Sequence, residues 1–147
     1  MIKNKTSGFT LLELLIVIAI IGVLASLLVP ALIGAQKRSY DAGAQACAKS
    51  IQTAQGIAQV DNRTFLLIGG GADKLNRSTD GINPACLLPD VFIKERSSAA
   101  DIVSAYTIDV WDRRGSKVFT ITPQSFIPNA PGATAFSNTG AGSSNMP

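Results

Sequence analysis

Histidine is absent from this chain of 147 residues, and cysteine occurs only twice. Without histidine, the chain cannot build a Ser-His-Asp or Cys-His catalytic group, or a metal site with histidine ligands. Two cysteines are also too few for a four-cysteine zinc site. We therefore expect no enzymatic activity, no metal site and no cofactor.

Charged residues are scarce as well. They make up 16% of the chain, whereas about 25% is usual for a soluble domain. The 13 basic and 10 acidic residues give a formal net charge of +3, which is too small to indicate a dedicated nucleic-acid binder. The length suits one domain of ordinary size.

The apolar residues are concentrated near the N-terminus. Residues 14–35 carry no charge, and Glu13 is the only charged residue between Lys5 and Lys37. About 20 residues of helix span roughly 30 Å, the thickness of the hydrocarbon core of a bilayer. Because the run is apolar on every helical face, it must enter a membrane, be removed, or pack against copies of itself.

Two ordinary interpretations of this run leave something unexplained. A secretory signal peptide has a shorter apolar core followed by a small-x-small cleavage site, but this run is longer and no clear site follows it. A plain signal anchor fits the length but does not explain Glu13. A carboxylate at the edge of an apolar span costs about 2–3 kcal/mol, so it suggests a function and a charged partner.

The residues before Glu13 indicate that partner. A short leader contains Lys3 and Lys5 and ends at Gly8, which Phe9 follows. A basic leader, a Gly-Phe step, an acid at the fifth position after the glycine and an unbroken apolar run together resemble the signature of type IV prepilins. The resemblance implies that a membrane-embedded prepilin peptidase cuts after Gly8 and N-methylates Phe9.

The resemblance also gives Glu13 a role in assembly. Cleavage would leave a cationic amine on Phe9, about four helical residues, or ~6 Å, from Glu13. In the family, the matching glutamate meets the amine of an incoming subunit. Because an unpaired buried charge is heavily penalised, such a pair would fix the axial register of the subunits. The alternative is a glutamate that snorkels to the edge of the membrane.

Gly22 and Pro30 extend the resemblance, since they stand where the family has a helix-weakening glycine and a kinking proline. Proline removes one helical hydrogen bond, and glycine adds backbone entropy. We expect either a static kink or a segment that loses helicity on assembly and lets the filament stretch.

The helix is expected to continue beyond the membrane. The leader (1–8) and the apolar transmembrane segment (9–35) are followed by residues 36–60, which have the spacing of an amphipathic helix. Its apolar stripe comprises Tyr40, Ala44, Cys47, Ile51, Ala54 and Ala58. The opposite, polar face comprises Arg38, Asp41, Gln45, Lys49, Gln52, Gln55 and Gln59. We predict that the stripe packs on a small head, residues 61–147.

The clearest strand pattern of the head lies between residues 104 and 112. There Tyr106, Ile108 and Val110 alternate with Thr107, Asp109 and Trp111. A return strand over residues 117–122 makes a hairpin, with Phe119 and Ile121 facing inward. Residues 64–68 fit a strand or a buried turn of helix, and residues 91–93 fit a short strand. We therefore predict an α+β pilin fold, with the long helix on a small antiparallel sheet of three to four strands.

The hairpin turn and the C-terminal region give weaker indications. Arg113, Arg114 and Lys117 make the turn basic, so it is either a contact for DNA or another anionic surface, or a solvated tip.

Residues 123–147 carry no charge and are rich in turn-forming residues, which predicts an irregular, partly mobile segment. Its candidate anchors to the sheet are Phe126, Ile127 and Phe136.

Cys47 and Cys86 are expected to form a disulfide, because the head would lie outside the cytoplasm, where disulfides persist. The bridge would tie the connection before the sheet to the helix and close a loop of about 40 residues. Two buried free thiols are the alternative. Many pilins instead have a disulfide that closes the C-terminal region, so the tail of this chain must be held in another way.

These observations predict a structural protein, the major subunit of a type IV pilus. It would lie in the bacterial inner membrane as a prepilin and then polymerise with copies of itself into a filament on the cell surface. Its partners would be the prepilin peptidase and the pilus assembly machinery, and nucleic acid is weakly supported. The main alternative is a pseudopilin of a type II secretion or competence system, although no acid follows Asp112 to build the calcium loop of secretion pseudopilins. A more distant alternative is a signal-anchored extracytoplasmic binding domain.

Overall fold

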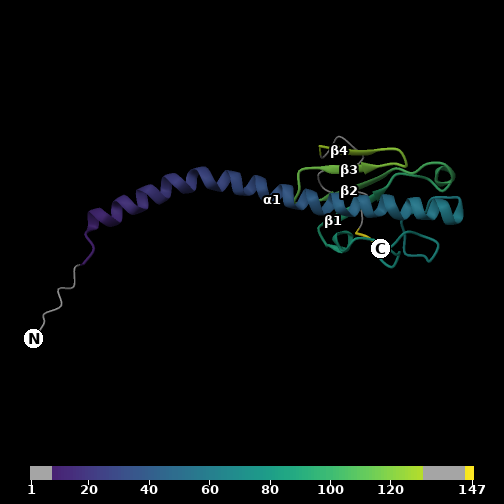
Figure 1. Ribbon diagram of the computed structural model, residues 1–147, viewed down its shortest axis with the longest axis horizontal. Helices are drawn as coiled ribbons and strands as arrows, with labels where there is room; N and C mark the ends of the chain where they lie inside the picture. The colour runs from purple at the N-terminus through teal and green to yellow at the C-terminus, as the bar shows by residue number, and fades with distance from the viewer. Residues whose placement is uncertain (1–7, 131–144) are drawn as a thin grey trace, which may run out of the picture. The chain divides into compact units, whose positions relative to one another are not determined.

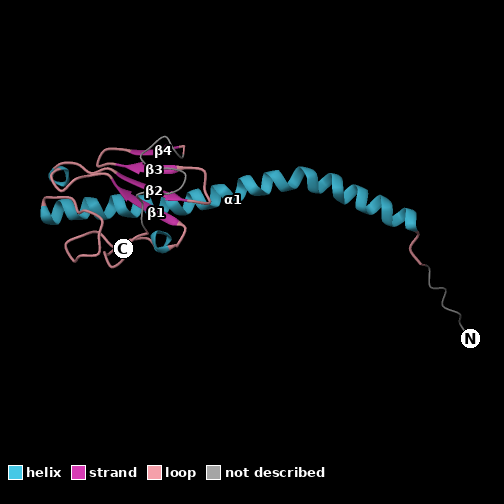
Figure 2. Ribbon diagram, turned by 180° about the vertical axis from the view of Figure 1, so that it is seen from behind, coloured by secondary structure: helices cyan, strands magenta, loops and turns pink. Residues whose placement is uncertain are grey.

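The computed structural model describes residues 8–130 and 145–147 (Figures 1 and 2). The chain divides into two compact units, residues 1–35 and 36–147. One long helix, α1 (Leu11–Asn62), begins in the first unit and ends in the second. The remaining elements all belong to the second unit: η1 (Pro84–Leu87), β1 (Val91–Glu95), η2 (Asp101–Val103), β2 (Ile108–Asp112), β3 (Val118–Ile121) and β4 (Phe126–Asn129).

In the first unit, α1 exposes its apolar side chains on every face. The exposed large residues there are Leu11, Leu12, Leu14, Leu15, Ile16, Val17, Ile18, Ile20, Ile21, Val23, Leu24, Leu27, Leu28, Val29, Leu32 and Ile33. By length and composition the helix is able to cross a membrane. It continues through Gly22 and Pro30 without interruption, although Pro30 has no amide hydrogen to donate to the helix.

In the second unit, four antiparallel strands form a sheet in the order β1-β2-β3-β4, and α1 lies across one face of it (Figure 2). The core between them contains helix residues Ala44, Cys47, Ala48, Ile51 and Ala54, and strand residues Val91, Ile93, Ile108, Val110, Phe119 and Ile121. Small side chains on the helix allow its backbone to approach the larger strand residues closely. The predicted α+β fold, with a long helix on a small antiparallel sheet, is confirmed.

The predicted polar face of the helix is wrong at two positions. Asp41 is 7% exposed and Gln55 is completely buried. The Gln55 side chain donates to the carbonyl of Leu66 (2.6 Å) and accepts from the Leu66 amide (2.8 Å). Gln55 thereby supplies the backbone of the segment after α1 with the hydrogen bonds that a neighbouring strand would otherwise give.

The predicted hairpin is present, with β2 and β3 in antiparallel register from the Ile108–Ile121 pair to the Trp111–Val118 pair. Its predicted alternation is incomplete, because every residue of β2 is buried. β2 lies between β1 and β3, and on its second face Trp111 packs with Val118 and Phe92. The β2 strand also begins later than the pattern predicts, since η2, a turn and a short irregular segment occupy residues 101–107.

Two segments differ from their predicted conformation. Residues 64–68 form neither a strand nor a helical turn, and only Ile68 makes an isolated bridge, to Leu75. Residues 126–129 were predicted as irregular but form β4, which pairs with β3. Pro128 is compatible with this strand because β4 lies at the edge of the sheet, where a missing amide donor costs little. Phe126 packs against the core and Ile127 is 48% exposed, whereas Phe136 lies outside the described residues.

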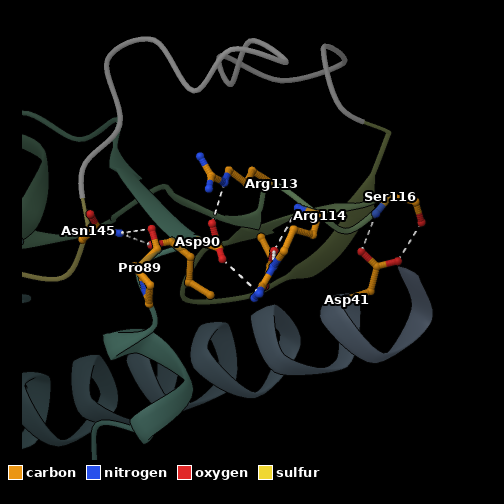
Figure 3. Close-up of polar contacts among 9 residues, drawn as sticks. Asp41, Pro89, Asp90, Arg113, Arg114, Ser116 and Asn145 are labelled. Carbon is orange, nitrogen blue, oxygen red and sulfur yellow. Dashed lines mark hydrogen bonds and ion pairs between the residues drawn. The ribbon is translucent and has the colours of Figure 1, made fainter. Parts of the chain in front are cut away.

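The last three residues are fastened to the head. The Asn145 side chain donates to the carbonyls of Pro89 (3.0 Å) and Val91 (2.9 Å), as Figure 3 shows in part. Met146 is buried in the core, and the Arg77 amide donates to the Pro147 carbonyl at 2.9 Å. Hydrogen bonds and one buried side chain therefore hold this end of the chain, without a disulfide of its own.

Candidate functional site

The N-terminal candidate residues lie at the start of α1. The Thr10 amide and hydroxyl both donate to the Glu13 carboxylate at 2.8 Å, and the Glu13 amide donates to the Thr10 hydroxyl at 3.2 Å. This is a capping box, in which a threonine and a glutamate three residues later satisfy the free amides of the first helical turn. The Thr-x-x-Glu spacing could have indicated it from the sequence. Glu13 therefore has a partner within its own chain.

Gly8 and Phe9 are exposed, and the Phe9 side chain is 83% accessible. A Cβ atom placed on Gly8 would meet no atom within 4 Å. Among residues 8–130 and 145–147, no contact therefore requires glycine at this position. The same holds for Gly22, where an added Cβ also has open space around it.

Asp41 holds the turn between β2 and β3 against α1 (Figure 3). Its carboxylate accepts from the Ser116 amide (2.8 Å), the Ser116 hydroxyl (2.6 Å) and the Lys117 amide (3.0 Å). Gly115 lies so close that a Cβ on it would be 2.3 Å from an Asp41 oxygen. The sequence gives no signal for this contact, because the two partners are about 75 residues apart.

The two arginines of the basic turn form ion pairs with neighbouring acids of the same unit. Arg114 pairs with Asp112 (2.8 Å) and with Asp90 (2.9 Å), and its guanidinium lies 4.2 Å from the centre of the Tyr40 ring. The hydrogen bond to Asp112 raises the pKa of the Arg114 guanidinium above its ordinary value. Arg113 also pairs with Asp90. Both arginine side chains nevertheless remain exposed, 63% for Arg113 and 38% for Arg114, so the turn is a solvated tip whose two arginines are paired with acids of the same chain.

Cys47 and Cys86 form a disulfide, with their Cα atoms 4.9 Å apart. Cys47 lies in the buried part of α1 and Cys86 in η1. Ser50, one helical turn from Cys47, accepts a hydrogen bond from the Asn83 amide at 3.1 Å. The bridge and this hydrogen bond fasten the segment before β1 to the helix.

Asp41→Ala is expected to lower the free energy of unfolding of the head by about 1–3 kcal/mol, because it leaves the amides of residues 116 and 117 without an acceptor. Asp41→Asn keeps one side-chain acceptor and should cost less. Gly115→Ala should also destabilise the head, through overlap with Asp41. Denaturant titration of the detergent-solubilised chain, followed by fluorescence of Trp111, the single tryptophan, measures all three. A loss below about 0.5 kcal/mol for Asp41→Ala would show that water replaces the carboxylate.

Comparison with known proteins agrees with this architecture. Residues 3–29 match the model of the prokaryotic N-terminal methylation motif. The chain is 35% identical over 93 residues to type II secretion system core protein G of Aeromonas hydrophila, covering 63% of this chain and 65% of that protein. It is 47% identical over 62 residues to the type IV wide pilus major component PilA4 of Thermus thermophilus, covering 42% and 47%.

A third relative is the type IV major pilin protein PilA of Myxococcus xanthus, 47% identical over 51 residues, which cover 35% of this chain and 23% of that protein. The matched parts thus span less than two thirds of each of these relatives. The chain thus carries the N-terminal methylation motif of prepilin-type proteins, and its long apolar helix and antiparallel sheet are consistent with the pilin fold. Its relatives are type IV pilins and type II secretion core proteins, which confirms the predicted resemblance to the type IV pilin-like superfamily.

Proposed function

We propose that this chain is the major structural subunit of a type IV pilus. The observation that carries the proposal is the helix surface between Leu11 and Ile33, which is apolar on all sides and has one acid at its start. Such a surface is stable only in a membrane or against other apolar helices. A subunit that moves from the membrane into a helical filament satisfies both requirements in turn.

Before assembly, the subunit lies in the inner membrane as a prepilin. The prepilin peptidase cuts between Gly8 and Phe9 and methylates the new amine of Phe9. The assembly machinery then moves the subunit into a bundle of identical helices, with the heads on the outside of a cell-surface filament. The chain performs no catalytic step and is itself the substrate of the peptidase.

Within the bundle, Glu13 receives the Phe9 amine of the next subunit. The Thr10 donors hold its carboxylate at the start of the helix, so the acceptor is in place before a neighbour arrives. Gly22 and Pro30 weaken the segment between Glu13 and the head and allow it to unwind when the filament is stretched.

A pseudopilin of a type II secretion system is the second candidate. The match to core protein G favours it, since it extends over 93 residues whereas the matches to the two pilins cover 62 and 51. The absence of any acid after Asp112 in the sequence favours the pilus. Deletion of the gene separates the two: loss of sheared surface filaments with normal protein secretion supports a pilin, and the reverse result supports a pseudopilin.

Filaments sheared from the cell surface should contain a chain that begins at N-methylated Phe9 and lacks residues 1–8. Gly8→Leu should abolish this cut, because the peptidase must approach an extended backbone closely, whereas Gly8→Ala should retain part of it. Intact mass and N-terminal sequencing are the measurements. An N-terminus within residues 34–36 would instead show ordinary signal-peptidase processing.

A further inference from the structure

The second unit, residues 36–147, is called the head from here on, and a groove of about 450 Å³ opens on it between residues 38–45 of α1 and strands β3 and β4. Phe119, Phe126 and Pro128 give it apolar walls, and the exposed cations Arg38 and Lys117 also line it. Among the described residues, neither cation has an ion-pair partner. We call this surface the basic groove.

One carboxylate, Asp41, also lines the basic groove, and it forms no ion pair with either cation. Asp41 is 7% exposed, and both of its oxygens accept hydrogen bonds from residues 116 and 117. Since two cations face one carboxylate, the groove keeps a net positive charge beside its apolar walls, which suits an apolar surface flanked by acids.

The same unit carries exposed apolar residues beside acids at the far end of α1. A hollow of about 250 Å³ is lined there by the exposed acids Asp61 and Asp80 together with Ile57 and Leu66. The Ile57 side chain is 53% exposed, and the neighbouring Val60 is 81% exposed. We call this surface the acidic end.

We propose that the basic groove of one subunit binds the acidic end of another copy of this chain. The inference rests on the proposed function and names the contact that the heads make within the filament. Arg38 and Lys117 would face Asp61 and Asp80, while Ile57 would enter the apolar part of the groove. All four of these charged side chains are exposed. Within the described residues of one subunit, none of them has an ion-pair partner.

The positions of the two surfaces determine what such a contact builds. Arg38 and Asp61 are 23 residues apart in the same helix (61 − 38), or about 35 Å at ~1.5 Å per residue. Two different surfaces at opposite ends of the head make a head-to-tail contact, which repeats from copy to copy and gives an open helical assembly unless its rotation closes a ring. Such a contact would link heads along the filament axis, separately from the pairing of the apolar helices.

Reversal of charge tests the contact in cells that express this chain as their only such subunit. Arg38→Glu with Lys117→Glu, and separately Asp61→Lys with Asp80→Lys, should each lower the yield of sheared filaments by about tenfold or more, because like charges then meet. The quadruple variant restores opposite charges across the contact and should recover most of the wild-type yield. Processing at Phe9 and oxidation of the Cys47–Cys86 pair, read by intact mass, show that each variant folds.

Lys37→Glu with Lys74→Glu is the matched control, since it makes the same change in net charge on exposed lysines that line neither surface. It should leave the yield near that of wild type, and it should not rescue the reversed acidic end. Equal rescue by this control would show that only net charge matters and would overturn the proposal. If the reversed groove lowers the filament yield but the reversed acidic end does not, the groove binds a different partner. That result would also overturn the proposal.

The outcome for the wild-type chain separates this inference from the proposed function. If wild-type filaments form but the quadruple variant stays defective while folded and processed, the head contact is wrong and the pilin function stands. If the wild-type chain forms no filaments at all, the proposed function fails, and the head contact fails with it.

Discussion

Glu13→Ala is expected to abolish filaments while leaving a processed, stable subunit in the membrane. The substitution removes the acceptor for the Phe9 amine of an incoming subunit and leaves that amine unpaired among apolar helices. Breaking a buried charge pair by removing one partner costs about 3–5 kcal/mol. Because the loss recurs at every subunit, even a fraction of it would stop growth. Membrane insertion should survive, since the span becomes more apolar.

The capping box supplies a competing explanation for such a phenotype, and two further variants separate them. Glu13→Gln keeps an oxygen that accepts from Thr10, as glutamine also serves in capping boxes, but it carries no charge. Thr10→Ala removes the hydroxyl and keeps the charge. If pairing between subunits is the role of Glu13, the glutamine variant should fail to assemble and the alanine variant at Thr10 should assemble.

Electron microscopy of sheared material counts the filaments, and intact mass of the membrane fraction reports processing. The strain must lack the wild-type subunit, because mixed filaments would conceal the defect. Normal filaments from Glu13→Ala would show that Glu13 only snorkels to the membrane edge and that apolar packing alone sets the register. Normal filaments from Glu13→Gln, with none from Thr10→Ala, would show that Glu13 acts as a helix cap.

The long helix and the central hairpin could be predicted because both follow from local periodicity. An unbroken apolar run followed by a stripe at intervals of three and four residues fits one helix, and alternation between Tyr106 and Val110 fits a strand. Turn residues between two such strands favour antiparallel pairing. The N-terminal motif could be recognised for a similar reason, since Gly8, Phe9 and Glu13 lie within one short stretch of sequence.

The structural features that the sequence did not predict depend on contacts between segments that are far apart in the sequence. Asp41 and Gln55 were assigned to the polar face because a charged or amide side chain is usually solvated. Their burial depends on backbone donors and acceptors at residues 116, 117 and 66, which the fold alone brings to them. In the same way, β4 forms because β3 offers a free edge to residues whose local pattern is irregular.

Asp109, on the second face of the sheet, is another residue whose burial could not be predicted from the local sequence pattern. Asp109 is completely buried although it was expected on the polar side of β2. The Thr120 hydroxyl donates to it at 2.6 Å, and the Arg96 guanidinium lies 3.4 Å away. A buried carboxylate is tolerated when a hydrogen-bond donor and a cation accompany it. Neither partner is adjacent to Asp109 in the sequence, so alternation by itself could not place this residue.

Replacement of both cysteines is expected to lower the free energy of unfolding of the head by about 2–4 kcal/mol. The bridge joins residues 39 apart, and a loop of that length corresponds to about 4 kcal/mol of chain entropy in the unfolded state. The segment between α1 and β1 contains no helix or strand of its own before η1. Phe65 and Leu75 pack this segment into the core, and its covalent and polar links to α1 are the bridge, the two Gln55 hydrogen bonds and the bond from the Asn83 amide to Ser50.

Cys47→Ser with Cys86→Ser is the appropriate variant, because a single substitution leaves a thiol that can pair between chains. Reduction of the wild-type chain should destabilise it by a similar amount and should leave the double variant unchanged. Trp111 fluorescence during denaturant titration in detergent gives both values. Since a domain is typically stable by only about 5–15 kcal/mol, the double variant should remain folded at 25 °C and unfold at clearly lower denaturant. Both thiols free in the unreduced protein, or a loss below about 0.5 kcal/mol, would show that core packing of Phe65 and Leu75 and the hydrogen bonds of Gln55 and Ser50 hold this segment without the bridge.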